Sequence, residues 1–176
     1  MMPIDLFLLR HGQSEGNVAL HRAKHGDDSA LTETFLRRHS SKWRLTNRGI
    51  IQTRAGGEWL RENTNTKFDY YYVSDYVRTK ETAIELGLPN ARWHTDFLLR
   101  EREYGEIDPV SGAYIKDSFY KTNESMAEIC MRIDHFIQKL RHKCKGKRVV
   151  VVSHGEVMWT LRLQLEQMPQ VNMRGK

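Results

Sequence analysis

The run of four valines at positions 149–152 constrains the fold of this chain more than any other feature of its sequence. A strand with one buried face alternates apolar and polar residues, whereas a continuous β-branched run is typical of a parallel strand that is buried on both faces. His154 and a glycine follow the run after a single serine. The run therefore predicts a central strand of a mainly parallel sheet, with a histidine at its C-terminal end.

A second apolar run, residues 4–9, also ends in polar side chains. Arg10, His11 and Gly12 follow it directly. In open α/β sheets, ligands bind at the carboxyl ends of the strands. Arg10 and His11 would point to opposite sides of a regular strand, so we expect the chain to turn at Gly12, where glycine permits it, for both side chains to reach one ligand.

A third run, the aromatic residues 70–72 with Val73, predicts another strand, and a helix is expected from Val77 to Leu86. Arg78 would lie in the first turn of that helix, close to the end of the strand. Most surface arginines are simply solvated. A cation at this end of a helix gains nothing from the helix dipole, however, because the dipole favours anions there. The position therefore favours a ligand-binding role for Arg78.

Five segments together resemble the signatures of the histidine phosphatase superfamily, in its phosphoglycerate mutase-like branch. The matches span residues 4 to about 165. They are Arg10-His11-Gly12 with Asn17, the Ser-x-x-x-Arg-x-x-x-Thr-Ala element at 74–83, Ser153-His154-Gly155, the Leu-x-Glu-Arg-x-Tyr-Gly loop at 99–105, and the Leu-Thr-x-x-Gly-x-x-Gln helix start at 45–52. Thr46 of the last segment is expected to cap a helix, which is a structural role.

The resemblance implies a three-layer α/β/α sandwich with a mainly parallel central sheet, formed by a single domain over residues 1–176. It also implies that His11 is the nucleophile and that Glu101 is the general acid, with Glu103 as the alternative. Phosphate binding is assigned by resemblance to the side chains Arg10, Asn17, Arg78 and His154. The implied chemistry uses no cofactor and no metal, because the arginines neutralise the phosphate charge.

The residues themselves are suited to transfer of a phosphoryl group. Arg10 and Arg78 can bind the oxygens of a phosphate monoester through charge-assisted hydrogen bonds. Their charges disfavour a protonated imidazole nearby, which lowers the pKa of His11 and keeps it nucleophilic. Attack on phosphorus would give a phosphohistidine. Glu101 would protonate the leaving oxygen and then activate the hydrolytic water, which is worth about two to four orders of magnitude in rate.

Three functions fit this set of residues. We favour a phosphomonoesterase. A phosphoglycerate-type mutase is the alternative, but position 103 is glutamate where those mutases carry histidine in a Glu-Arg-His-Tyr-Gly loop, and their Trp-Arg-Arg-Ser segment does not occur in the sequence. A non-catalytic phospho-ligand binding protein is a further alternative, although the catalytic set is intact.

Composition limits the partners. The net charge of +6 suits an anionic substrate, which is expected to be a phosphorylated small molecule, with a phosphoprotein as the alternative. Lys and Arg are spread along the chain and no recognised nucleic-acid module occurs, so we expect no nucleic-acid partner. We expect neither a leader peptide nor a membrane-spanning segment, because the first residues carry no charged region followed by a long apolar stretch. Two cysteines separated along one predicted helix indicate a reduced, cytoplasmic protein. The oligomeric state is not encoded in any recognisable pattern.

Two regions depart from the family pattern. Residues 18–45 form a longer segment than in typical mutases and are rich in Lys, Arg and His, so they predict either a basic lid over the substrate or an ordinary solvated surface. His21 and His25 have the spacing of a metal pair, but surface histidines are the better interpretation because no third ligand is near in the sequence. The chain also ends soon after the last predicted helix, and we expect a loose tail from about residue 168.

Overall fold

The computed structural model describes residues 1–65, 67–114 and 123–166. The valine run lies in β4 (Arg148–Ser153), which pairs in parallel with β1 (Asp5–Arg10) on one side and β2 (Tyr70–Val73) on the other. A short fourth strand, β3 (Trp93–Thr95), pairs in parallel with β2, so the strand order is β1-β4-β2-β3. The prediction of a central parallel strand is confirmed.

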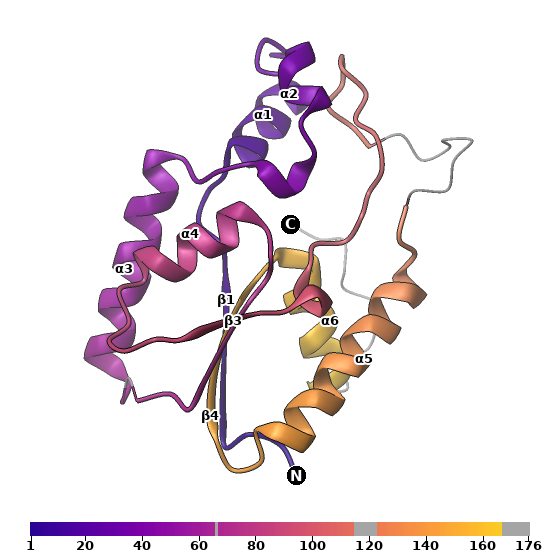
Figure 1. Ribbon diagram of the computed structural model, residues 1–176. Helices are drawn as coiled ribbons and strands as arrows, with labels where there is room; N and C mark the ends of the chain where they lie inside the picture. Colours follow the sequence, from indigo (N-terminus) through magenta and orange to yellow (C-terminus); the bar gives the residue numbers. More distant parts are fainter. Residues whose placement is uncertain (66, 115–122, 167–176) are drawn as a thin grey trace.

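Helices cover both faces of the sheet (Figure 1). On one face, α3 (Asn47–Asn63) and α4 (Val77–Glu85) pack against Val150 and Val152. On the other, α5 (Met126–Lys143) and α6 (Gly155–Glu166) pack against Val149 and Val151. Successive valines of β4 thus enter opposite apolar cores, which is why the run needs no polar residue. The expected three-layer α/β/α sandwich is confirmed.

The helix α5 follows its sequence pattern closely. Its apolar stripe is the centre of one core, where Ile129, Ile133, Phe136, Ile137 and Leu140 are fully or almost fully buried. The helix begins with a capping box, in which Ser125 and Glu128 satisfy each other's backbone N–H groups. Thr46 likewise caps α3 by accepting a hydrogen bond from the Gly49 N–H.

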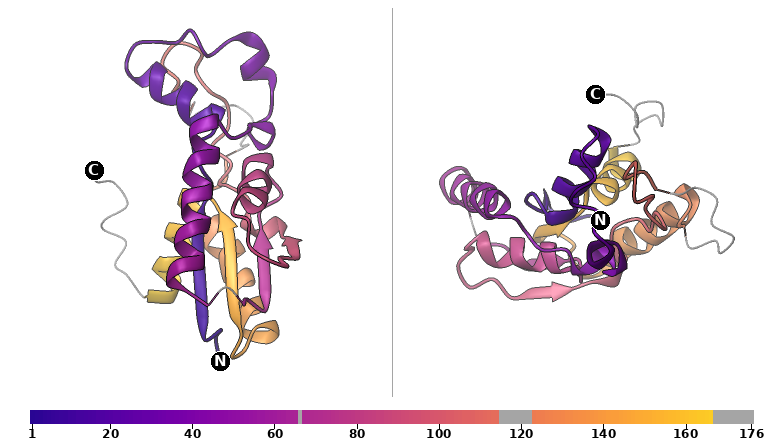
Figure 2. Two further views of the ribbon diagram at one scale, coloured as in Figure 1. Left: turned by 90° about the vertical axis from the view of Figure 1, so that its left-hand side faces the viewer. Right: turned by 90° about the horizontal axis from the view of Figure 1, so that it is seen from above.

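A smaller third apolar cluster lies beyond the carboxyl ends of the strands. It is built from α1 (Glu15–Lys24), α2 (Glu33–Arg37) and the chain up to Trp43, which includes the short helix η1 (Ser40–Lys42). The ring of Trp43 stacks on Phe35 with centroids 5.0 Å apart. Figure 2 shows these helices standing above the sheet. Much of the segment 18–45 is therefore folded around a core of its own, positioned where ligands bind in α/β sheets.

The structure bears differently on the expected tail, the two cysteines and the absence of a membrane span. The expected tail from residue 168 lies outside the described residues, so the single domain over 1–176 stays a prediction. Cys130 and Cys144 are free thiols, and Cys144 follows the end of α5 instead of lying within it. Within the described parts of the chain, no helix has the length and apolar character needed to cross a membrane.

Candidate active site

His11 immediately follows β1 and is 7% exposed. Its Nδ1 lies 2.7 Å from the carbonyl oxygen of Gly12, which can only accept a hydrogen bond, so Nδ1 carries the proton. The other ring nitrogen, Nε2, accepts from Arg78 Nε at 3.1 Å and therefore holds the lone pair. Burial, assisted by the charges of Arg78 and Arg10, lowers the pKa of His11 to about 3. The imidazole is thus neutral at pH 7, as expected, although burial contributes more than the arginines do.

Arg78 is in the first turn of α4 and is buried, with 4% exposure. Besides its bond to His11, its Nη1 donates to the Ser40 carbonyl at 2.8 Å and its Nη2 donates to His154 Nδ1 at 3.1 Å. An arginine has five N–H donors, so one on each Nη nitrogen is left over. Arg78 therefore joins three distant segments and keeps two donors for a ligand. The alternative of a solvated surface arginine is wrong.

His154 follows β4 and is fully buried. Because Nδ1 accepts from Arg78, Nε2 carries the proton and donates to Ser74 Oγ at 2.8 Å. Burial and the Arg78 charge hold the pKa of His154 well below its usual range. Its ring meets that of His11 edge to face, with centroids 5.3 Å apart. The two histidines expected at the ends of separate strands are thus neighbours in the structure.

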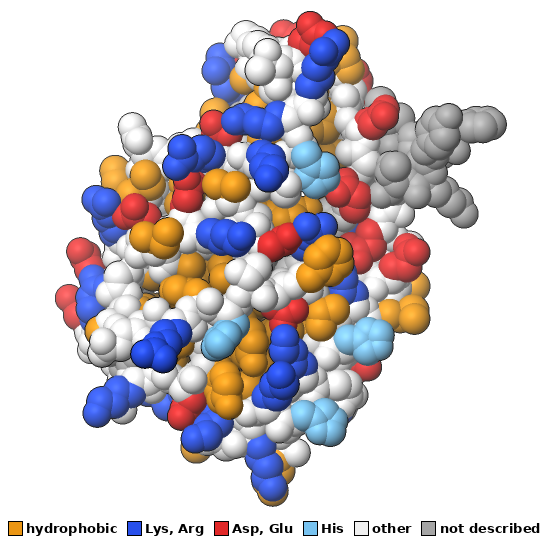
Figure 3. Space-filling view, in the orientation of Figure 1, with side chains coloured by type: hydrophobic (Ala, Val, Ile, Leu, Met, Phe, Trp, Pro, Cys, Tyr) orange, Lys and Arg blue, Asp and Glu red, His pale blue; other side chains and the backbone are white. Residues whose placement is uncertain are grey.

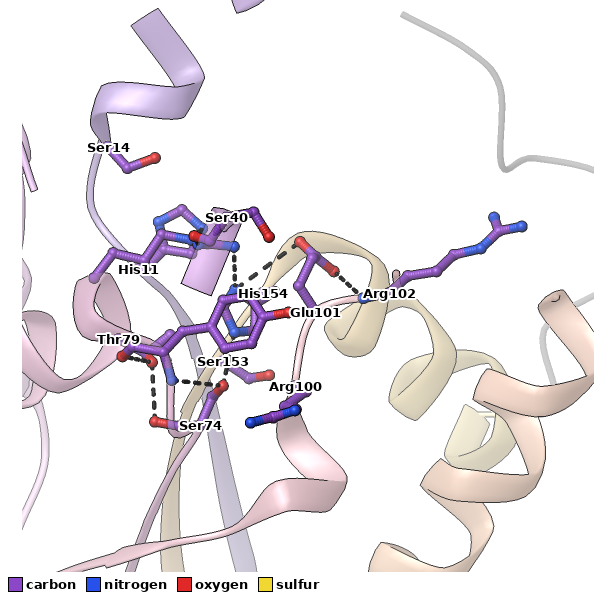
Figure 4. A network of polar contacts seen from close by, with 12 residues as sticks. His11, Ser14, Ser40, Ser74, Thr79, Arg100, Glu101, Arg102, Ser153 and His154 are labelled. Atoms are coloured by element: carbon purple, nitrogen blue, oxygen red, sulfur yellow. Dashed lines mark hydrogen bonds and ion pairs between the residues drawn. The ribbon is translucent and has the colours of Figure 1, made fainter. Parts of the chain in front are cut away.

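Glu101 and Glu103 have different surroundings, which separates the two candidate acids. Glu101 Oε2 lies 4.0 Å from His154 Nδ1, and only 17% of the Glu101 side chain is exposed (Figure 4). Burial raises its pKa to about 7, against the opposing effects of the Arg102 N–H and the Arg78 charge. Glu103 is 39% exposed and faces His39 Nε2 at 3.5 Å. The geometry favours Glu101 over Glu103.

Arg10 and Asn17 complete the expected set. Arg10 is the last residue of β1 and is exposed. Asn17 is in the first turn of α1, where its Oδ1 accepts from the N–H and hydroxyl of Ser14. The amide NH2 of Asn17 is consequently the end left for a ligand. Both side chains line the same cavity as His11, Arg78 and Glu101, and its volume is about 720 Å³.

The whole chain was compared with known proteins. The family model of the histidine phosphatase superfamily (branch 1) matches residues 6–175. The chain belongs to this superfamily. A phosphoglycerate mutase-like protein of Arabidopsis thaliana is 25% identical over 88% of this chain, which spans 55% of that protein's length. A 2,3-bisphosphoglycerate-dependent phosphoglycerate mutase of a Methylobacterium species is 28% identical over 92% of the chain and 80% of its own length.

Solved structures of phosphatases share the fold. An Escherichia coli protein described as a putative alpha-ribazole-5'-P phosphatase superposes with a TM-score of 0.68 at 21% identity, covering 93% of this chain and 80% of its own. A mycobacterial glucosyl-3-phosphoglycerate phosphatase also superposes with a TM-score of 0.68. It is 23% identical, and the match covers 95% of this chain and 84% of its own. At these identities the likeness establishes the fold of the histidine phosphatase superfamily and nothing finer.

Several residues that hold the site together had no assigned role in the sequence interpretation. Ser74 bonds His154, and Thr82 Oγ1 accepts from the Gly12 N–H at 3.2 Å. Both belong to the superfamily element at 74–83, where Ser74, Arg78 and Thr82 recur every fourth residue; that spacing was the available signal. Tyr76 packs its ring against His154, with centroids 4.9 Å apart, and under the Arg78 guanidinium at 4.7 Å.

The turn after β1 works differently from expectation. Gly12 is not among the residues with positive φ, so glycine's conformational freedom is not what the position requires. A Cβ at Gly12 would instead lie 2.3 Å from the Gly49 carbonyl oxygen. The absence of a side chain lets α3 approach the turn closely, and this contact fixes the position of His11.

The histidines of α1 do not form part of a larger ligand cluster. His21 and His25 have ring centroids 4.4 Å apart, and His25 Nδ1 bonds the His21 carbonyl. Among residues 1–65, 67–114 and 123–166, no three His, Cys, Asp or Glu side chains gather as a metal site would require.

Lys and Arg side chains are scattered over the face of the molecule in Figure 3, where they are interspersed with acidic residues.

Proposed function

We propose that this member of the histidine phosphatase superfamily is a metal-independent phosphomonoesterase that acts through a phosphohistidine on His11. One observation carries the proposal. The unprotonated Nε2 of a buried, neutral His11 is held by Arg78, which also holds His154, and a glutamate suited to proton transfer at neutral pH lies beside them.

In the first step, the lone pair of His11 Nε2 attacks phosphorus, and the bond from phosphorus to the ester oxygen breaks. The hydrogen bond from Arg78 Nε to Nε2 is given up, and the remaining donors of Arg78, with Arg10 and the Asn17 amide, bind the phosphoryl oxygens. Glu101 donates its proton to the leaving oxygen. The Gly12 carbonyl stabilises the positive charge that develops on the imidazole by accepting from Nδ1.

In the second step, water attacks phosphorus while the Glu101 carboxylate takes its proton, and the N–P bond breaks to return neutral His11. A pKa of about 7 suits Glu101 to both directions of transfer at neutral pH. His154 accepts from Arg78 Nη2 through Nδ1 and donates to Ser74 Oγ through Nε2, so it holds the Arg78 guanidinium in place for the phosphoryl oxygens. The arginines supply the positive charge that a metal ion would otherwise provide.

The mutase alternative is supported by the bacterial phosphoglycerate mutase relative. A mutase must return its phosphoryl group to a bound acceptor before water reaches it. The cavity beside His11 is large, and Glu103 stands where the mutases carry histidine. These features favour hydrolysis.

The test is hydrolysis of p-nitrophenyl phosphate in the presence of EDTA by the wild type, by His11→Ala and by a matched control, His142→Ala. His142 is an exposed histidine of α5 and should be dispensable. We expect metal-free turnover and an acid-labile phosphoryl group in both the wild type and the His142→Ala control, and neither in His11→Ala. Conversion of one phosphoglycerate isomer to the other without phosphate release would establish the mutase instead. Equal activity in His11→Ala would refute both.

A further inference from the structure

The active-site cavity has two chemically different ends. The inner end holds Arg10, His11, Arg78 and Glu101. The outer end contains four apolar side chains, here called the outer wall: Leu20 of α1, Leu31 and Leu36 from the α2 region, and Ile107 of the loop beyond Glu101. Charged residues such as Glu33, Arg37 and Glu106 also line the cavity. Leu31 is buried, whereas Leu20, Leu36 and Ile107 are only partly buried because they stand at the edge of the third apolar cluster. The outer wall thus offers apolar surface to whatever occupies the cavity.

The basic residues of the same segment that line the cavity, Arg37, Arg38 and His39, each lie beside a carboxylate. The expectation of a basic lid requires their charges to be free for the substrate. Four basic residues of the segment lie beside acidic partners instead: Arg37 with Glu33 at 2.6 Å, Arg38 with Glu15 at 2.8 Å, His39 with Glu103 at 3.5 Å, and Arg44 with Glu81 at 2.5 Å. The segment 18–45 therefore borders the cavity, where it presents apolar side chains together with basic ones that lie beside carboxylates.

We propose that the outer wall binds the leaving group of the substrate, and that this group is an extended apolar chain or ring instead of the short, charged carbon skeleton of phosphoglycerate. The inference rests on the proposed phosphatase function. Glu101 protonates the leaving oxygen, so the leaving group extends from the inner end into this cavity. Its volume of about 720 Å³ falls within the range of about 300–1,000 Å³ typical of sites for larger ligands. A three-carbon skeleton would leave most of the wall in water.

The experiment is a series of ethyl, butyl, hexyl and octyl phosphate, with phosphoglycerate for comparison and phosphate release as the readout. The alkoxide leaving groups are similar in basicity, so differences in kcat/KM report contacts with the chain. Each methylene that reaches the outer wall should raise kcat/KM by about two- to fourfold. Phosphoglycerate should be hydrolysed more slowly than hexyl phosphate. A flat series, or faster hydrolysis of phosphoglycerate, would overturn the proposal.

Two variants locate the effect. Leu36→Ala and Leu20→Ala shorten the wall from different helices, and Ile51→Ala is the control because Ile51 is 67% exposed on α3. The readout is the ratio of hexyl to ethyl phosphate hydrolysis on one preparation, which cancels any difference in the fraction of folded enzyme. The ratio should fall by about three- to tenfold in the first two variants and stay unchanged in the third. An unchanged ratio in both wall variants would refute the assignment.

Failure of the phosphatase function itself gives a different result. In that case no alkyl phosphate releases phosphate, and the wall is tested by calorimetric binding of ethyl and hexyl phosphonate, which are not hydrolysed. Tighter binding of the hexyl compound by about tenfold or more would support the outer wall without turnover. Equal affinity of the two compounds would overturn it.

Discussion

Replacing Glu101 by glutamine should strongly lower the activity and stabilise the protein, and both effects follow from the burial of one carboxyl group. Burial raises the pKa of Glu101 from the usual 4.5 to about 7. At pH 7 about half of the Glu101 side chains are therefore protonated, against roughly one in 300 for a glutamate with a pKa of 4.5. Glutamine keeps the shape and can still accept from the Arg102 N–H, but it neither donates nor takes the catalytic proton.

The activity arm uses two substrates. For an alkyl phosphate, whose alkoxide needs a proton to leave, we expect Glu101→Gln to lower kcat by about 10²–10⁴. For p-nitrophenyl phosphate the loss in kcat/KM should be smaller, because its leaving group departs without protonation. The wild type should also lose kcat/KM for the alkyl ester about tenfold per pH unit above pH 7–8, as Glu101 ionises. The residual activity of Glu101→Gln should lack this decline.

The stability arm follows from proton linkage. The folded state holds the Glu101 proton more tightly than the unfolded chain, so this proton contributes stability below about pH 4.5. That contribution is lost as the pH rises through about 7. A difference of about 2.5 pKa units corresponds to at most about 3 kcal/mol in the free energy of unfolding. Glutamine carries no charge at any pH. By urea unfolding, Glu101→Gln should therefore be more stable than the wild type by up to this amount near pH 8, and equal to it near pH 4.

Glu103→Gln is the matched control for both arms. Glu103 is more exposed and faces His39, so its replacement should change kcat and the free energy of unfolding much less. Loss of alkyl phosphatase activity in Glu103→Gln with retention in Glu101→Gln would assign the acid to Glu103. A Glu101→Gln protein that is less stable than the wild type near pH 8 would refute the argument from burial.

Three further outcomes are expected from other parts of the molecule. Arg78→Lys should lower kcat/KM by about 10²-fold or more without unfolding the chain, checked by steady-state kinetics and circular dichroism, because lysine lacks the fork that bonds both histidines. Gly16→Ala should lower the free energy of unfolding by about 1–3 kcal/mol in urea titrations, since its Cβ would lie 2.1 Å from the Trp43 ring. Phe136→Ala should cost about 3–5 kcal/mol in the same assay, because the ring is fully buried between α5 and the sheet.

The parts of the fold that were predictable are those with a local cause. The four consecutive valines indicate that β4 is buried on both faces, and the apolar stripe of α5 indicates which side of that helix is buried. The Ser125–Glu128 capping box marks where α5 begins. The helix expected from Val77 to Leu86 agrees with α4 within one residue. The positions of His11 and His154 were predictable for a related reason. Parallel strands end at one edge of a sheet, so residues that follow two strands become neighbours.

The contacts that were not predictable form between segments far apart in the sequence, and no local sequence pattern indicates them. Nothing in the sequence around Ser40 indicates that its carbonyl accepts from Arg78, since a backbone carbonyl is present at every residue. The resemblance favoured Glu101 over Glu103 as the acid, but the chemistry of the two residues did not separate them. The two carboxyls are chemically identical and two residues apart, and only the folded loop buries the first and leaves the second partly in water. In both cases the outcome depends on burial or on position in the folded chain, and neither can be read from the residue type.

The segment 18–45 shows why composition alone left two interpretations open. Its arginines and histidines were compatible with a basic lid over the substrate and with an ordinary solvated surface, because charge is counted per residue in a sequence. In the folded chain, charge counts only where it is unpaired, and partners such as Glu15 and Glu81 come from outside the run of basic residues. The leucines between the cations, which carried no signal individually, are instead brought together at the cavity. The proposed preference for an apolar leaving group therefore rests on where the fold places these leucines, and not on the number of charges in the segment.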